Sequence, residues 1–327
     1  KPNHFIASDF QLLPAAEASP VPQFIVQQPH WRWWFNNDDT FNIPKGFIAI
    51  SMRSPLAGQS AEQAVLLKLY ARMLQEQMNE YAYPAALAGL HYSLKNHMRG
   101  LSLKVSGFNE KQPLLFHKML VAVTQPEFDE QRFSRIKADM QRSLENAVKQ
   151  QPYNMLMNDL SQLMYQSLFT EQDKLQALSG LTLADLQQYV AQFLQQLDVD
   201  AMVYGNYSRQ QAQAIAASAR HLLPQPEPAA FTLPDINILR LPEQASAMAV
   251  ANEYSDAALL YYVQANDEQA ANYAAFEIAA QLYQADFYSS LRTEKQLGYI
   301  VTSGAYPMHK VPGLFFVVQS PVAGVQS

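Results

Sequence analysis

The feature that most constrains this chain is that its pattern of elements starts again after a proline-rich stretch. The tripeptide EQA opens a helical pattern at Glu62 and again at Glu268, 206 positions later. Gly89 precedes a strand pattern, as does Gly298, 209 positions on, and the segment GLSLKVSG is matched by GLFFVVQS at an offset of 213. This common order, with slowly drifting offsets, predicts two copies of one fold.

Strand and helix patterns alternate in both copies, which predicts an α+β fold made of two homologous α/β sandwich domains. We expect an extended lead-in over 1–24, a complete domain over 25–224, a proline-rich boundary over 225–240, and a second domain over 241–327. The first copy continues past its second glycine-led strand with further helices and strands. We therefore expect the second domain to be truncated.

Local signals place several elements. A helical pattern runs over 60–78, and Pro84 is expected to open a second, short helix that Gly89 closes. After it, LSLKVS alternates apolar and polar residues, as one half-buried strand of a hairpin does. The segment 236–263 is expected to supply strands at the start of the second copy.

All three tryptophans stand beside Phe35, within four positions of one another. In a strand, Trp31 and Trp33 face one side and Trp34 the other. This predicts either a core strand covered on both faces or an interface with a segment upstream of the chain.

Composition excludes several classes. Of the residues, 49% are hydrophobic and 16% charged, which is typical of a folded globular protein, and the net charge of -6 argues against nucleic acid as a partner. No run of 18 apolar residues and no signal-peptide pattern occur, so no membrane-spanning segment is predicted. Cysteine is absent, which excludes thiol catalysis. The chain starts without Met, which fits a segment of a longer protein.

The histidines offer no metal motif. No two of the seven lie three to five positions apart, as a helical zinc site requires. We expect His91 and His97 on opposite sides of the hairpin turn, without a carboxylate at ligand spacing. Phosphate-binding and serine-nucleophile motifs are also absent from the sequence. We therefore predict no metal site within this segment.

The second glycine corner carries a polar pair. Arg292 lies six positions before Gly298 and Tyr299 one position after it, where the first copy has Tyr83 and Leu90. The fold therefore does not demand these two residues. They are either a helix-end arginine bonded to carbonyls beside a half-exposed tyrosine, or a pair that acts on a ligand.

Four segments together resemble one family: DDTFNIPKG, NEYAYPAALAGLHYSL, LSLKVSGFNEKQP, and LRTEKQLGYIV followed by GLFFVVQS. They are similar to the C-terminal half of the pitrilysin and insulysin family of inverted zinc peptidases, over about residues 5–320. The resemblance implies four related domains in two bowl-like halves that enclose peptides in a chamber. The zinc motif H-x-x-E-H would lie in the first half, outside this chain.

The resemblance also assigns roles. Arg292 and Tyr299 match the residues that bind peptide carbonyls near the scissile bond and stabilise the developing oxyanion. Tyr288 would line an apolar substrate pocket. The implied protein is a zinc-dependent endopeptidase of which this chain is an inactive C-terminal portion that supplies substrate-binding residues. The alternative is a non-catalytic structural or partner subunit of the same fold.

The implied partners are peptide substrates and the N-terminal half of the same polypeptide, with no nucleic acid and no membrane. Homo-oligomerisation is left open. Zn²⁺ is the implied cofactor, bound outside this segment. The resemblance favours a periplasmic or otherwise exported protein over a cytoplasmic one.

Overall fold

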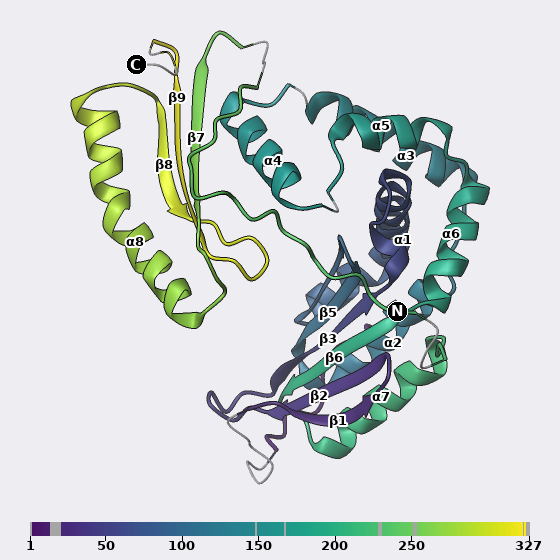
Figure 1. The fold of residues 1–327 in the computed structure, drawn as a ribbon. Coiled ribbons are helices and arrows are strands. Elements are labelled where there is room, and N and C mark those ends of the chain that lie inside the picture. Colours follow the sequence, from purple (N-terminus) through teal and green to yellow (C-terminus); the bar gives the residue numbers. More distant parts are fainter. Residues whose placement is uncertain are drawn as a thin grey trace. The chain divides into compact units, whose positions relative to one another are not determined.

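The chain folds as two compact units (Figure 1), described here from a computed structural model. The first unit comprises Lys1–Arg142 and Gln172–Pro234, and the second comprises Ser143–Glu171 and Asp235–Ser327. The structure describes residues 2–13, 21–147, 149–166, 168–227, 231–250, 254–322 and 324. Parts of the expected lead-in and of the proline-rich boundary therefore lie outside the described residues.

The first unit is built on a six-stranded sheet with the strand order β1-β2-β6-β3-β5-β4. Its strands are β1 (Gln23–Gln28), β2 (Trp31–Asn37), β3 (Lys45–Arg53), β4 (Leu90–His97), β5 (Gly100–Phe108) and β6 (Asp198–Gly205). All neighbouring pairs are antiparallel except β2 and β6. A mostly antiparallel sheet packed against helices confirms the expected α+β class.

The helices described in the first unit are α1 (Ala61–Leu87), α2 (Gln112–Thr124), α5 (Glu171–Gly180), α6 (Leu183–Gln195), α7 (Arg209–Leu222) and most of α3 (Glu130–Ala147), whose last residues group with the second unit. Helix α2 packs against β3 and β5, and α7 packs against β1 and β2 (Figure 1). Side-chain caps define where helices begin. Ser60 accepts the backbone N–H of Gln63, and Thr182 and Ser208 each start a reciprocal capping box.

The expected break at Pro84 is wrong, because α1 is one continuous helix with Pro84 in its last turn. Packing explains the continuation: Met78 and Ala85 lie two turns apart on one face, and each is at most 1% exposed. Proline removes only one hydrogen bond so close to the helix end. Gly89, at φ +74°, then turns the chain out of the helix, as expected.

The tryptophan segment forms the core strand β2. Trp31 and Trp33 are 2% and 0% exposed, whereas Trp34 lies on the other face and donates its indole N–H to Asp200 Oδ1 at 2.9 Å. Both faces of the strand are thus used, as the core-strand interpretation predicts. In β5, the apolar residues of the alternating pattern are fully buried, which confirms the half-buried strand.

The placement of the two hairpin histidines needs correction. His91 and His97 both lie on β4, which pairs with β5 as far as His97 opposite Gly100. The turn therefore comes after both histidines, at Met98 and Arg99. The ring of His97 contacts the Ser102 hydroxyl at 3.0 Å.

The second unit has a three-stranded antiparallel sheet with the order β7-β9-β8. Its elements are α4 (Pro152–Met164), β7 (Ala257–Gln264), α8 (Ala270–Tyr288), a π-helical turn (Ser289–Glu294), β8 (Ile300–Ala305) and β9 (Gly313–Ser320). The sequence strand, helix, strand, strand, with the last strand in the middle, repeats the β3-α1-β4-β5 arrangement of the first unit.

Two features of the second unit differ from the sequence boundaries. Helix α4 packs against β7 and β9, so residues 143–171 group with the second unit although the sequence places them in the first domain. Among the described residues of 236–256, only an isolated bridge from Ile238 to Tyr165 replaces the expected strands. Pro242 and the small residues after it lack the alternation that stabilises a strand. No described helix is long and apolar enough to cross a membrane.

Candidate functional site

The second glycine corner begins where α8 changes its hydrogen bonding. After Tyr288 the chain passes into a π-helical turn, in which the N–H of Lys295 bonds to the carbonyl of Ser290 at 3.0 Å. Gln296 then takes a positive φ of 50°, and Leu297 closes the turn onto Leu291 O at 2.9 Å. Single π-helical turns of this kind are frequent at functional sites.

Gly298 lets the corner pack closely against β9. It is buried, and a Cβ added there would lie 2.4 Å from Gln319 O. Only glycine permits this approach. The next residue, Tyr299, donates its backbone N–H to the same carbonyl at 3.2 Å. The position of Tyr299 is therefore fixed by backbone contacts before its side chain makes any.

Arg292 and Tyr299 meet at one peptide group. The Nη1 of Arg292 donates to the carbonyl of Gly298 at 2.7 Å, and the N–H of that peptide group belongs to Tyr299. This contact is what the structural alternative describes, a helix-end arginine bonded to a carbonyl. Arg292 is nevertheless exposed, and a guanidinium has five N–H donors. The remaining donors are available to a ligand.

The Tyr299 hydroxyl is held by two side chains. It donates to Asp256 Oδ2 at 2.7 Å and lies 2.5 Å from Gln319 Nε2, which also contacts Asp256 Oδ2 at 3.0 Å. The hydrogen bond to Asp256 raises the pKa of Tyr299 and lowers the pKa of Asp256. Tyr299 is 44% exposed. The corner thus presents an oriented phenol to solvent.

Tyr288 stands at the end of α8 and is 49% exposed. No hydrogen bond in the described part of the chain joins it to Arg292 or Tyr299. Its neighbour Phe287 instead packs edge-on against Phe316, with ring centroids 5.2 Å apart. The structure therefore brings two of the three expected site residues together and leaves the third as a separate exposed aromatic.

The sequence interpretation missed Asp256 and Gln319. One signal was present for Gln319: at the offset of 213, the first copy has Ser106 in its place. The same comparison had singled out Tyr299. Asp256 gave no signal, because its position depends on the register in which Ala257 pairs with Ser320.

The described residues contain no group of three or more His, Asp or Glu side chains that could hold a metal ion. The donor set at the corner is a guanidinium, a phenol, an amide and a single carboxylate. Such a set binds carbonyl oxygens better than it binds zinc, which prefers histidine and several anionic ligands.

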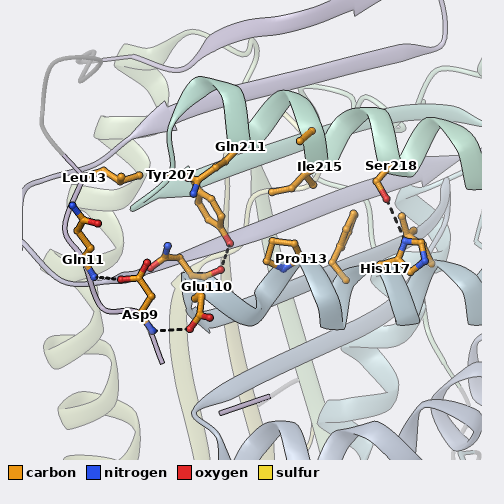
Figure 2. A pocket seen from close by; sticks show the side chains of 14 residues that line it. Asp9, Gln11, Leu13, Glu110, Pro113, His117, Tyr207, Gln211, Ile215 and Ser218 are labelled. Carbon is orange, nitrogen blue, oxygen red and sulfur yellow. Dashed lines mark hydrogen bonds between the residues drawn. The ribbon is translucent and has the colours of Figure 1, made fainter. Parts of the chain in front are cut away.

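A pocket of about 420 Å³ in the first unit is a second candidate (Figure 2). It lies between α2 and α7, where residues 9–13 cross. His117 and Ser218 face one another there at 3.2 Å, but no carboxylate of the described residues orients the ring, as a catalytic triad requires. Glu110, whose pKa is lowered to about 2 by Lys111 and two backbone N–H groups, holds the crossing segment. The described residues of this pocket therefore do not form a catalytic triad.

Comparison with known proteins identifies the family. The family model described as the middle or third domain of peptidase M16 matches residues 1–177, and a model described as the C-terminal lobe domain 4 of PQQ synthase PqqF-like proteins matches residues 278–327. The chain belongs to the M16 peptidase family. This confirms the resemblance to pitrilysin and insulysin.

Individual relatives agree with this assignment. Human insulin-degrading enzyme is 33% identical over 97% of this chain, and a putative zinc protease of Schizosaccharomyces pombe is 29% identical over 91%. The chain covers 32% of the length of each. The crystal structure of pitrilysin matches with a TM-score of 0.81 at 21% identity, over 98% of this chain and 34% of that one. This last likeness supports the fold.

Proposed function

We propose that this chain is the C-terminal portion of a zinc-dependent endopeptidase that degrades peptides in an enclosed chamber. Membership of the M16 peptidase family supports the reaction class. The chain spans about a third of the length of its curated relatives, and under this proposal the zinc site would lie in residues outside it. The partners would be peptide substrates and the N-terminal half of the same polypeptide, and an exported location stays a prediction.

The observation that carries this proposal is the geometry of the second corner. The Arg292 side chain donates to the carbonyl of the peptide group that joins Gly298 to Tyr299, and the side chains of Arg292 and Tyr299 are both exposed to solvent. A peptide substrate offers carbonyl oxygens near the scissile bond, and fixed donors stabilise the negative charge that develops there in the transition state. We assign Arg292 to binding such a carbonyl and Tyr299 to donating to the developing oxyanion.

Zinc fits the family but not these residues. The S. pombe relative carries zinc protease in its name, and no cluster of described side chains here could ligate the ion. The metal would therefore be held outside this chain, where it would supply an activated water. The residues described here would bind and orient the peptide, and no step of their action passes through the metal.

Tyr288 is assigned to an apolar subsite. It is the last residue of α8, one helical turn before Arg292, and about half of its side chain is exposed. An exposed aromatic ring next to carbonyl-binding donors suits an apolar substrate side chain, because burying the ring on binding is favourable. Its removal should raise KM more than it lowers kcat.

The test is cleavage of a quenched fluorescent peptide by the intact protein, with Tyr299→Phe compared against Tyr283→Phe. Both variants lose one exposed hydroxyl from the second unit, and that of Tyr283 makes no hydrogen bond within the described part of the chain. We expect Tyr299→Phe to lower kcat/KM about 10- to 1000-fold and Tyr283→Phe to leave it unchanged. Equal kcat/KM values for Tyr299→Phe and Tyr283→Phe would indicate that the second corner serves only in packing. No cleavage by the wild type would favour the non-catalytic subunit.

A further inference from the structure

The amide orientation of Gln319 is fixed by the backbone. Its side chain is buried, with the whole residue 1% exposed, and its Oε1 lies 3.1 Å from the backbone N of Tyr153. A backbone N–H can only donate, so the oxygen of the amide must be the atom that faces it. The Nε2 group is therefore the one that faces Asp256 and Tyr299.

This orientation determines which groups donate and which accept in the hydrogen bonds among Gln319, Tyr299 and Asp256. An amide nitrogen only donates, so the Tyr299 oxygen must accept from Gln319 Nε2 across 2.5 Å. The phenol has a single proton, and the acceptor that it meets is Asp256 Oδ2 at 2.7 Å. In this arrangement the Tyr299 proton is committed to Asp256, and a lone pair is all that the hydroxyl can offer a ligand.

We propose that Asp256 is a positioning residue that holds the Tyr299 proton in the free protein and yields it to a peptide carbonyl when substrate binds. This inference rests on the proposed function of Tyr299 as a donor to substrate. Gln319 stays bonded to both partners throughout, so the hydroxyl keeps its place while its proton changes acceptor. No covalent bond is made or broken in this step.

The hydrogen bond from Tyr299 to Asp256 should lower kcat/KM, because it competes with the hydrogen bond to substrate. A hydrogen bond to a carboxylate is roughly twice as strong as one to a neutral carbonyl. The bond to Asp256 must break before Tyr299 can donate to the developing oxyanion, and breaking it costs more with a carboxylate as acceptor than with a neutral amide, so this bond raises the barrier that kcat/KM measures. A substitution that weakens the hydrogen bond between Tyr299 and Asp256 without moving Tyr299 should therefore raise kcat/KM.

Asp256→Asn is the matched substitution. Both Tyr299 and Gln319 donate to the same carboxylate oxygen, Oδ2. An asparagine with its amide oxygen in that place keeps the hydrogen bonds from Tyr299 and Gln319 and removes the charge. The Ser255 side chain, which also bonds to the Asp256 carboxylate, can donate to or accept from the amide. The control is Asp286→Asn, which makes the same charge change on the exposed face of α8.

The experiment is a double-mutant cycle in the intact protein with a quenched fluorescent peptide. We expect Asp256→Asn to raise kcat/KM about 3- to 5-fold, Asp286→Asn to leave it unchanged, and the gain to vanish in the Tyr299→Phe background. In parallel, NMR with ζ-¹³C-labelled tyrosine should show the Tyr299 titration moving to a lower pH in Asp256→Asn.

The outcomes separate the two proposals. The role of Asp256 would be overturned, and the peptidase proposal kept, if the wild type cleaves the peptide and Asp256→Asn leaves kcat/KM unchanged or lowers it. The same holds if Asp256→Asn raises kcat/KM equally in the Tyr299→Phe background. An unchanged Tyr299 titration in Asp256→Asn would overturn the hydrogen bond itself. Absence of cleavage by every protein would overturn the proposed function, and the inference about substrate would fall with it.

Discussion

The two glycine corners of this chain share a fold and differ in chemistry. In each, a helix leads into a strand that pairs with the central strand of the order β3-β5-β4 or β7-β9-β8. In the first corner Leu90 is 1% exposed and packs in the core, whereas Tyr299 of the second is 44% exposed. Burial stabilises the first corner, and the second presents polar groups to solvent. The fold therefore tolerates either.

The register extends the comparison to the acidic residue. Gly107 pairs with Gly46 in the first unit, as Ser320 pairs with Ala257 in the second. Lys45 thus occupies the place that corresponds to Asp256. Together with the earlier offsets, the set Asp256, Tyr299 and Gln319 replaces Lys45, Leu90 and Ser106. All three members of the polar cluster are specific to the second copy, which supports a role that packing does not require.

The largest difference between the two corners should appear in the free energy of unfolding when the glycine of each is changed to alanine. A Cβ at Gly298 would meet a backbone carbonyl, so Gly298→Ala should destabilise the protein by about 2 to 3 kcal/mol and abolish most activity. Gly89→Ala meets the Phe108 ring, which can shift, and should cost about 1 to 2 kcal/mol for its positive φ. Urea unfolding measures both. A larger loss at Gly89 would contradict the close approach that fixes Tyr299.

Removing the arginine of the second corner should have the next largest effect. Arg292→Ala should lower kcat/KM about 10- to 100-fold, because the donor to a substrate carbonyl is lost along with the bond to Gly298. Arg240→Ala is the control, since its exposed ion pair with Glu268 lies in the same unit. Equal kinetics for the two variants would leave Arg292 as a helix-end contact alone.

The truncation of Tyr288 gives a smaller, selective effect. Tyr288→Ala should raise KM about 3- to 10-fold for a peptide with an apolar side chain at that subsite, with kcat little changed. Leu282→Ala, which shortens an exposed apolar residue earlier on the same helix, serves as the control. The same change in KM for a peptide with a polar side chain there would argue against an apolar subsite.

The smallest effect concerns pH. The folded pKa of Asp256 lies below its ordinary value, so its bond to Tyr299 is fully formed above about pH 4 and is lost as the pH falls through the lowered pKa. The pKa of Tyr299 is raised by the same hydrogen bond, so the bond is fully formed up to about pH 10, the ordinary value of a tyrosine, and is lost only as the pH rises through the higher pKa of the folded protein. The Tyr299 NMR signal should stay constant in between. An acid transition that survives in Asp256→Asn would belong to another group.

Sequence patterns predicted the repeat, the buried strand β2 and the alternation of β5, because each depends on local periodicity. The helix break at Pro84 was predicted wrongly, since burial of Ala85 outweighs the missing N–H of one proline near the helix end. Strands expected over residues 236–256 are absent from the described part of that segment, because hydrophobic residues without alternation do not define a face. Local sequence patterns thus predicted that these helices and strands exist, whereas tertiary packing determined where they begin and end.

The candidate site was predictable only in part. Arg292 and Tyr299 stood out because the first copy has different residues in their places. Their roles stay proposals. Asp256 could not be found, because the contact between it and Tyr299 joins the first residue before β7 to the residue before β8, and only strand register brings these together. The grouping of α4 with the second unit is likewise a tertiary contact that no sequence signal carried.

The most direct test compares the hydroxyls of the two corners in the intact protein. Tyr83 and Tyr299 are both exposed, at 72% and 44%, and each can be changed to phenylalanine without loss of ring packing. Removing the Tyr299 hydroxyl should lower kcat/KM for a quenched fluorescent peptide about 10- to 1000-fold, while Tyr83→Phe leaves it unchanged. Equal activity of the two variants would contradict the claim that the second corner acts on substrate.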